Sequence, residues 1–157
     1  MLIDSHCHLN DPAFEETLSE VIARAKAAGV SRFIVPAYDF ESLGRTAELA
    51  ASSPGVIFPA FGIHPWHVQE PIIYERVLGF IRQNHPVAIG EIGLDFSPEC
   101  PPHELQIKSL TQQLEWISGV RGFKWCRGID RLQKLKGASG PDFDRCNHAQ
   151  YEWASVG

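Results

Sequence analysis

Short apolar runs alternate along this chain with longer segments in which apolar residues recur every three to four positions. The runs indicate strands buried on both faces, and they cover residues 2–3, 32–35, 56–61 and 87–89. The segments with helical spacing predict amphipathic helices, and they cover residues 12–28, 41–51, 72–83 and 103–117. This alternation predicts a parallel sheet built from βα units, with about four units in the first 115 residues.

Two local signals bound the first predicted helix. Asp11-Pro12 is typical of an N-cap followed by proline at the first helical position, and Gly29 is typical of the residue that ends a helix. On the last predicted helix we expect the buried positions to be Leu105, Ile107, Leu110 and Leu114.

Polar and reactive side chains follow the predicted strands where each one ends. They are His6, His8, Tyr38-Asp39, His64 and Glu91. Barrel enzymes carry their active sites at the C-terminal ends of their strands. Open doubly wound sheets also bind ligands there, so this position alone does not choose between the two architectures.

Composition narrows the class of protein. The 157 residues, 44% hydrophobic and 21% charged, fit one ordinary globular domain. With a formal charge of −5, the chain lacks the overall positive charge that attracts nucleic acid or an acidic membrane. A metal ion can nevertheless supply positive charge locally. The four cysteines have no disulfide or CxxC spacing, and no apolar run approaches the roughly 20 residues of a membrane span. We therefore expect a cytoplasmic protein with reduced thiols and no membrane partner.

The pattern changes at Trp116. Residues 116–157 carry 7 Lys and Arg against 4 acids, whereas residues 1–115 carry 7 against 15. Glycines interrupt the candidate elements, and residues 132–136 form the one weak helical fragment. We predict a core region over residues 1–115 and a poorly structured tail over 116–157, and we hypothesise that the tail is frameshifted or replaced. An uninterrupted reading frame in several independent isolates would contradict this hypothesis.

His6-Cys7-His8 has the spacing of a metal site. On an extended segment residues i and i+2 point to the same face, so both imidazoles can bind one ion while Cys7 packs on the other side. Two loop histidines without a ligand are the alternative. Asp4 could fix a histidine tautomer from behind, or it could cap the end of the strand.

Glu91 is the candidate carboxylate. In Gly90-Glu91-Ile92-Gly93 the flanking glycines allow close approach of the backbone, as a carboxylate bridging two metals requires. An exposed turn glutamate is the alternative. His64, in Gly62-Ile63-His64-Pro65, is a candidate contact to a substrate phosphate or leaving group, or a structural loop histidine. Asp95 could orient a ligand or cap the following loop. Four further histidines have no neighbouring motif that indicates a functional role, and we expect them to be solvated or structural: His67, His85, His103 and His148.

These motifs together resemble the TatD family of metal-dependent hydrolases and deoxyribonucleases. The resemblance rests on Asp4-Ser5-His6-Cys7-His8-Leu9, Gly62-Ile63-His64-Pro65 and Gly90-Glu91-Ile92-Gly93-Leu94-Asp95, and it covers about residues 1–115. It implies an α/β fold of the (β/α)₈ TIM-barrel type, metallo-dependent hydrolase-like. It also implies that His6 and His8 bind one divalent metal, that Glu91 bridges to a second and acts in catalysis, and that His64 lies near the scissile phosphate. The implied reaction is hydrolysis of a phosphodiester at a DNA end by a metal-activated water.

The chain departs from this family after the fourth helix. The family's later histidine-bearing strands and its Thr/Ser-Asp pair have no counterpart in residues 116–157. We therefore expect an incomplete barrel of about four βα units, impaired in activity, that self-associates through its open edges. The alternatives are another metal-barrel hydrolase, acting on a phosphomonoester or an amide, and a non-catalytic metal-binding fragment. The ligand types leave Mg, Mn and Zn open.

Overall fold

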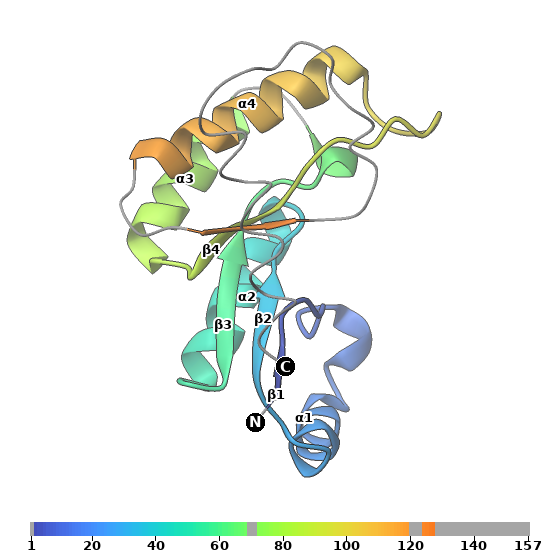
Figure 1. Cartoon of the computed structure of the whole chain (residues 1–157), viewed down its shortest axis with the longest axis vertical. Coiled ribbons are helices and arrows are strands. Elements are labelled where there is room, and N and C mark those ends of the chain that lie inside the picture. Colours follow the sequence, from blue (N-terminus) through green and yellow to red (C-terminus); the bar gives the residue numbers. More distant parts are fainter. Residues whose placement is uncertain (1, 69–71, 120–123, 128–157) are drawn as a thin grey trace.

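A computed structural model describes residues 2–68, 72–119 and 124–127. Its five strands form one all-parallel sheet with the order β1-β2-β3-β4-β5, and Figure 1 shows β1, β2 and β3 side by side. The strands are β1 (Leu2–Asp4), β2 (Val30–Pro36), β3 (Ile57–Phe61), β4 (Ala88–Ile92) and β5 (Lys124–Arg127).

Each of the first four strands is followed by an α-helix. The helices are α1 (Leu18–Ala27), α2 (Phe40–Ser52), α3 (Ile72–Asn84) and α4 (His103–Gly119), with two short 3₁₀ helices, η1 (Pro12–Phe14) and η2 (Pro65–His67). Within the described residues, no helix combines the length and apolar composition needed to cross a membrane.

The order of the strands identifies the architecture. A doubly wound sheet reverses direction at a switch point, whereas here each strand is added beside the preceding one. Because βαβ crossovers are right-handed, adding every strand on the same side places the helices on one face of the sheet. The other face is then the inner side of a barrel wall. The predicted fold is confirmed: four βα units and a fifth strand form part of a (β/α) barrel.

The structure adds one strand after residue 115 that the sequence pattern did not predict. The pattern predicted no further βα unit there, yet β5 pairs in parallel with β4, with Ala88 opposite Lys124. The run 124–127 is too short and too polar at its ends to stand out as a strand, and the free edge of β4 supplies its pairing partner. The weak helical fragment 132–136 and His148 lie outside the described residues.

The change in composition at Trp116 falls inside a helix that packs against the core. α4 continues to Gly119, and Trp116 is buried in the core with its ring centroid 6.4 Å from that of Tyr74 on α3. The predicted separation at residue 116 therefore does not coincide with the end of an element.

The first helix begins later than predicted. Asp11 caps η1 rather than an α-helix, with its side chain accepting a hydrogen bond from the backbone N–H of Ala13 at 2.8 Å. α1 starts only at Leu18, and it ends as expected before Gly29, whose φ of 95° suits a residue without a β-carbon.

Two hydrophobic clusters hold the elements together. One packs α1 against β2, and its fully buried members are Leu9, Phe33, Val35 and Ile57. The larger one joins β3 and β4 to α2, α3 and α4, and includes Phe61, Ile63, Tyr74, Val77, Ile89 and Trp116. The expectation for α4 was partly wrong, because Ile107 is exposed whereas Gln106, Ser109 and Gln113 are buried.

Candidate metal centre

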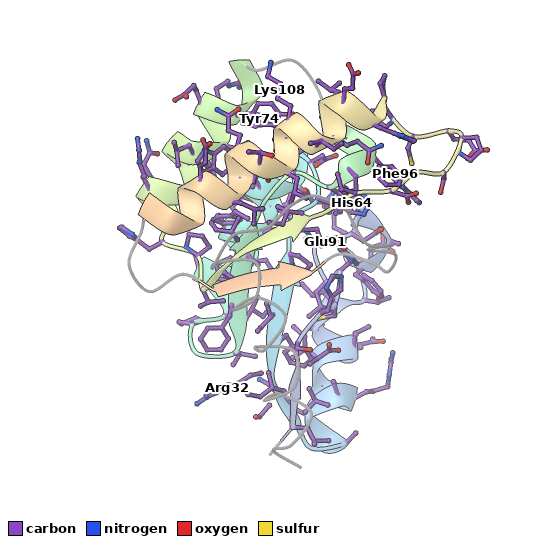
Figure 2. The ribbon with its side chains drawn as sticks, turned by 45° about the horizontal axis from the view of Figure 1, so that its top comes forward. Arg32, His64, Tyr74, Glu91, Phe96 and Lys108 are labelled. Atoms are coloured by element: carbon purple, nitrogen blue, oxygen red, sulfur yellow. The ribbon has the colours of Figure 1, made fainter. Side chains whose placement is uncertain are left out.

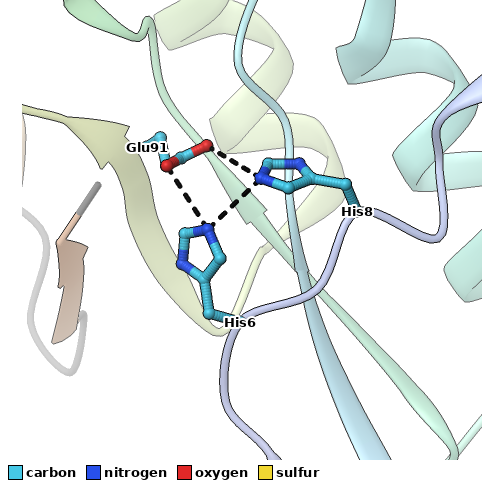
Figure 3. Close-up of side chains that lie close together, drawn as sticks. All are labelled: His6, His8 and Glu91. Atoms are coloured by element: carbon cyan, nitrogen blue, oxygen red, sulfur yellow. Dashed lines mark hydrogen bonds and ion pairs between the residues drawn. The ribbon is translucent and has the colours of Figure 1, made fainter. Parts of the chain in front are cut away.

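Three candidate ligands from distant parts of the sequence converge beyond the strands. His6 and His8 follow β1, and Glu91 lies in β4. The Nε2 atoms of the two histidines are 3.3 Å apart. His6 Nε2 lies 3.3 Å from Glu91 Oε1, and His8 Nε2 lies 3.4 Å from Glu91 Oε2, as Figure 3 shows. The side chains that the sequence predicted as metal ligands therefore meet at one point.

The segment 5–8 presents its side chains alternately, as expected for an extended segment, although it lies beyond the end of β1. β1 ends at Asp4, but the backbone N–H of Cys7 still donates to the carbonyl of Ile34 at 3.2 Å. Cys7 packs against the cluster between α1 and β2, away from the two imidazoles. Burial, aided by the charge of Asp4, raises the pKa of the Cys7 thiol to about 12, so it stays a thiol.

Asp4 takes the simpler of its two expected roles. Its Oδ1 accepts a hydrogen bond from the backbone N–H of His6 at 3.1 Å, which caps the end of β1. This contact fixes the turn of the chain that carries His6, rather than the tautomer of an imidazole ring.

Glu91 is held in place through its backbone. Its N–H donates to the carbonyl of Ala37, at the end of β2, at 2.9 Å. To reach it, the end of β4 passes directly over Gly62, where a β-carbon would lie 2.8 Å from the carbonyl oxygen of Glu91. The close approach predicted for this motif is thus made possible by a glycine on the neighbouring strand end.

The carboxylate of Glu91 is ionised in spite of its burial. Only 2% of the residue is exposed, and burial raises its pKa. The contact with His6 and the nearby imidazoles of His6, His8 and His64 act in the opposite direction, and the pKa lies below its usual value. A buried carboxylate of this kind favours a positive charge beside it, which a bound divalent ion would supply.

The donor atoms fit a divalent metal. Two ligand atoms about 2.1 Å from one ion at a tetrahedral angle are about 3.4 Å apart, and the distances between the three side chains are 3.3–3.4 Å. Buried Glu91 Oε1 lies 3.3 Å from His6 Nε2 but forms no well-aligned hydrogen bond within the described residues, so it can accept a bond from an ion. In the part of the chain that the structure describes, the ligand atoms of His6, His8 and Glu91 gather within 4.8 Å of one another.

His64 lies beside this centre but outside the group of three. It follows β3, only 8% of it is exposed, and Figure 2 places it near Glu91. Burial lowers its pKa more than Glu91 and Asp95 raise it, so the ring is neutral. Its Nδ1 accepts a hydrogen bond from the backbone N–H of Trp66 at 3.3 Å, which leaves the ring proton on Nε2.

Two buried glutamines of α4 hold the loops that carry these residues. Gln113 accepts from the N–H of Ile63 at 2.7 Å and donates to its carbonyl at 3.2 Å. Gln106 binds the N–H and the carbonyl of Asp95 in the same way, at 2.8 and 2.7 Å. Neither glutamine was predicted from the sequence. The two glutamines are seven residues apart, with Ser109 between them, so they lie on one face of the helix. This spacing is the feature of the sequence that could have indicated their shared role.

Asp95 acts as a loop cap, the second of its two expected roles. Its Oδ1 accepts hydrogen bonds from the hydroxyl and the backbone N–H of Ser97, and its Oδ2 accepts one from the indole N–H of Trp66 at 2.7 Å. These hydrogen bonds, chiefly those from Ser97, lower the pKa of Asp95 to about 2.

Several aromatic rings lie next to the centre. The ring of His8 meets that of Tyr38 at 5.7 Å, Tyr38 meets His67 at 5.6 Å, and His64 meets Trp66 at 5.3 Å between centroids. His67 and Trp66 had no predicted role. His103 stacks on Phe96 at 4.2 Å, and His85 is exposed directly after α3.

The chain is similar to known metal-dependent hydrolases and nucleases. The chain is 35% identical over 118 residues to the uncharacterized metal-dependent hydrolase YabD of Bacillus subtilis (strain 168), covering 73% of this chain and 45% of that protein. It is 29% identical over 115 residues to the 3'-5' ssDNA/RNA exonuclease TatD of Pantoea vagans (strain C9-1), covering 72% and 44%. The chain therefore spans about half the length of the curated relatives that it matches.

A solved structure and a family model agree with these relatives. The crystal structure of YjjV, a TatD homologue from Escherichia coli K12, matches with a TM-score of 0.67 and 32% identity, over 73% of this chain and 46% of that one. The model of the TatD related DNase family matches residues 3–118, which include His6, His8, His64 and Glu91. The chain belongs to the TatD family of metal-dependent hydrolases.

Proposed function

We propose that this protein is a metal-dependent phosphodiesterase that acts on the end of a single-stranded nucleic acid, with DNA as the first candidate. The observation that carries the proposal is the convergence of His6, His8 and Glu91 at the C-terminal ends of barrel strands. The family model and the exonuclease relative support the substrate class.

The three side chains supply a suitable ligand set. The Nε2 atoms of His6 and His8 lie 3.3 and 3.4 Å from the oxygens of Glu91, and the ionised carboxylate of Glu91 offers two oxygens with one negative charge. When bound, divalent ions polarise a phosphoryl oxygen and lower the pKa of a bound water. We propose that His6, His8 and Glu91 would hold such ions, with Glu91 shared between two of them in a complete site, and Mg²⁺, Mn²⁺ and Zn²⁺ all suit the donors.

His64 is placed to act as a hydrogen-bond donor. Because its Nδ1 accepts the N–H of Trp66, its Nε2 carries the proton at neutral pH. We propose that Nε2–H donates to an oxygen of the scissile phosphate or of the leaving group. The backbone N–H of His64 donates to the carbonyl of Tyr38 at 2.9 Å, which holds the residue at the end of β3.

Activity of these 157 residues is proposed to be lower than that of the full-length relatives. The chain covers 44–45% of the two relatives described above. The family's later histidines and its catalytic Asp, which the resemblance places in the second half of the barrel, have no counterpart in residues 116–157. The centre described here would then bind metal but turn over slowly.

The proposal is tested by measuring metal binding and hydrolysis on the purified chain. Binding of Zn²⁺ and Mn²⁺ is measured by titration calorimetry, and hydrolysis is followed with an end-labelled single-stranded DNA oligonucleotide. The His6→Ala and Glu91→Gln variants are expected to lose metal affinity by tenfold or more, roughly the effect of removing a ligand or its close partner. Slow shortening of the oligonucleotide is expected in the parent chain and not in the variants.

His85→Asn is the matched control. His85 is an exposed imidazole outside the cluster, and its φ of 45° is one that asparagine also adopts. Equal metal binding by His6→Ala and His85→Asn would refute the metal centre. Hydrolysis of p-nitrophenyl phosphate or of an amide in preference to the oligonucleotide would refute the substrate class. Metal binding without any turnover would leave a non-catalytic metal-binding fragment as the function.

A further inference from the structure

Trp66 is the residue whose exposure the metal centre leaves unexplained. It lies in η2 directly after His64 and Pro65, and 59% of it is exposed to solvent. A single exposed apolar side chain is ordinary in itself. What sets Trp66 apart is that its ring is fixed in place and lies beside the reactive centre.

Two contacts fix the indole of Trp66, and a hydrogen bond holds the backbone of the same residue. Its Nε1–H donates to Asp95 Oδ2 at 2.7 Å, and its backbone N–H donates to His64 Nδ1 at 3.3 Å. Its ring stands at 89° to the ring of His64, with 5.3 Å between centroids. A ring held this way has already lost most of its rotational freedom, so a ligand that stacks on it costs little additional entropy.

The residue that holds the indole is itself held. Asp95 accepts two hydrogen bonds from Ser97. The buried side chain of Gln106 binds the backbone N–H and carbonyl of Asp95. The indole is therefore connected through Asp95 to α4, the helix whose Gln113 also holds the loop of His64.

A row of aromatic rings connects Trp66 with the candidate metal ligand His8. Rings follow one another from His8 to Tyr38, from Tyr38 to His67, from His67 to His64 and from His64 to Trp66, with centroids 5.3–6.3 Å apart. A polymer bound with one phosphate at His6, His8 and Glu91 has this row of rings beside it.

Charge favours a base over a phosphate at this point. The carboxylate of Asp95 lies against the indole and is ionised at neutral pH, and the chain as a whole carries −5. A phosphate group here would be repelled, whereas a nucleobase is neutral and presents a flat face of its own.

We propose that Trp66 is a stacking platform for a nucleobase of the single-stranded substrate, next to the nucleotide whose phosphate lies at the metal centre. Asp95 is the positioning residue that orients the indole for this contact. The inference rests on the proposed function, which supplies the single-stranded nucleic acid. Aromatic stacking tolerates any base, so the platform gives affinity without sequence preference.

The test compares two probes that differ only in the base. One is a fluorescein-labelled hexathymidylate, and the other is the same oligonucleotide with abasic residues at the three positions of the end that is cleaved. Binding to the full chain is followed by fluorescence anisotropy in EDTA and again in Ca²⁺. The variants are Trp66→Ala, Trp66→Phe and Asp95→Asn, each checked for folding by thermal denaturation.

Trp66→Ala is expected to weaken binding of hexathymidylate by roughly 5- to 100-fold, the range for loss of one stacking contact, and to leave the abasic probe unchanged. Trp66→Phe should restore part of the lost affinity, because it keeps a ring but not the N–H. Asp95→Asn should give a smaller loss, confined to the probe with bases. Ile107→Ala, which removes exposed apolar surface on α4, should change neither probe.

Equal effects of Trp66→Ala on both probes, or no effect on either, would overturn the platform. So would failure of the parent chain to bind hexathymidylate in both EDTA and Ca²⁺. Failure of the proposed function is distinguishable, since base-dependent binding through Trp66 without any hydrolysis would refute the reaction while supporting the platform.

Discussion

Gly62 and Glu91 lie in direct contact through their backbones, and this contact places the carboxylate beside His6 and His8. A β-carbon on Gly62 would come within 2.8 Å of the carbonyl oxygen of Glu91 and within 2.9 Å of the carbonyl carbon of Gly90. Both neighbours are main chain, so neither can rotate away. The end of β4 reaches Ala37 only because residue 62 has no side chain.

Gly62→Ala is therefore expected to displace Glu91. We expect stability to fall by about 1–3 kcal/mol, the usual cost of overpacking, and metal affinity to fall by roughly tenfold or more. Thermal denaturation and titration calorimetry with Zn²⁺ measure the two effects. Gly44→Ala, on α2, is the control: a β-carbon there meets no atom within 4 Å, and the change should stabilise the helix by about 0.5–1 kcal/mol. Unchanged metal binding in Gly62→Ala would contradict this account.

Gln113→Leu is expected to loosen the loop of His64. The substitution leaves the buried N–H and carbonyl of Ile63 without their side-chain partner, at a cost of about 2–4 kcal/mol. Amide hydrogen exchange should accelerate at Ile63 and at neighbouring residues of the loop. Gln112→Leu makes the same exchange one position earlier, at a half-buried residue, and should change stability by less than about 0.5 kcal/mol. Similar losses in the two variants would argue against a specific hold by Gln113.

Asp95 should stay ionised far into the acid range. Its pKa of about 2 lies below the value of about 3.9 for a free aspartate. Its hydrogen bonds therefore stabilise the fold fully above about pH 4, and this contribution is lost as the pH falls through about 2. The side-chain carboxyl ¹³C signal of Asp95, assigned with Asp95→Asn, should not titrate between pH 6 and 3.

Ser97→Ala provides the comparison for that titration. The hydroxyl of Ser97 is the main cause of the lowered pKa of Asp95, so its removal should move the midpoint upward, toward the ordinary value. A midpoint near pH 4 in the parent chain, or no change in Ser97→Ala, would show that these hydrogen bonds do not persist in solution.

The edge strand β1 should promote self-association of this chain. Leu2 and Ile3 are 59% and 43% exposed, and β1 is an edge of the described sheet. An exposed apolar edge is a template for pairing. Light scattering after size exclusion should show a mass that rises with protein concentration, and Ile3→Lys should reduce this rise. Val87→Lys charges an exposed apolar residue away from that edge and should have a smaller effect. A single monomer mass at all concentrations would contradict the prediction.

The sequence by itself determined the order of the elements and which residues are the candidate metal ligands. Helical and strand periodicities are local, so α2, α3 and β2 were predicted nearly to their ends. His6, His8 and Glu91 could be named because two imidazoles at i and i+2 and a carboxylate at a strand end form a chemically specific set. The resemblance to a family rested on the same motifs.

Only the tertiary structure decided what holds that set in place. Gln113 and Ile63 are fifty residues apart in sequence, and the crossing of β4 over Gly62 joins two different strand ends. Neither of these two contacts can be recognised from the periodicity of the sequence, because long-range contacts depend on which elements the fold brings together. The pairing of β5 with β4 is of the same kind, since a short polar run became a strand by meeting an open edge. Local pattern specified the candidate ligands, and packing between distant segments specified their geometry.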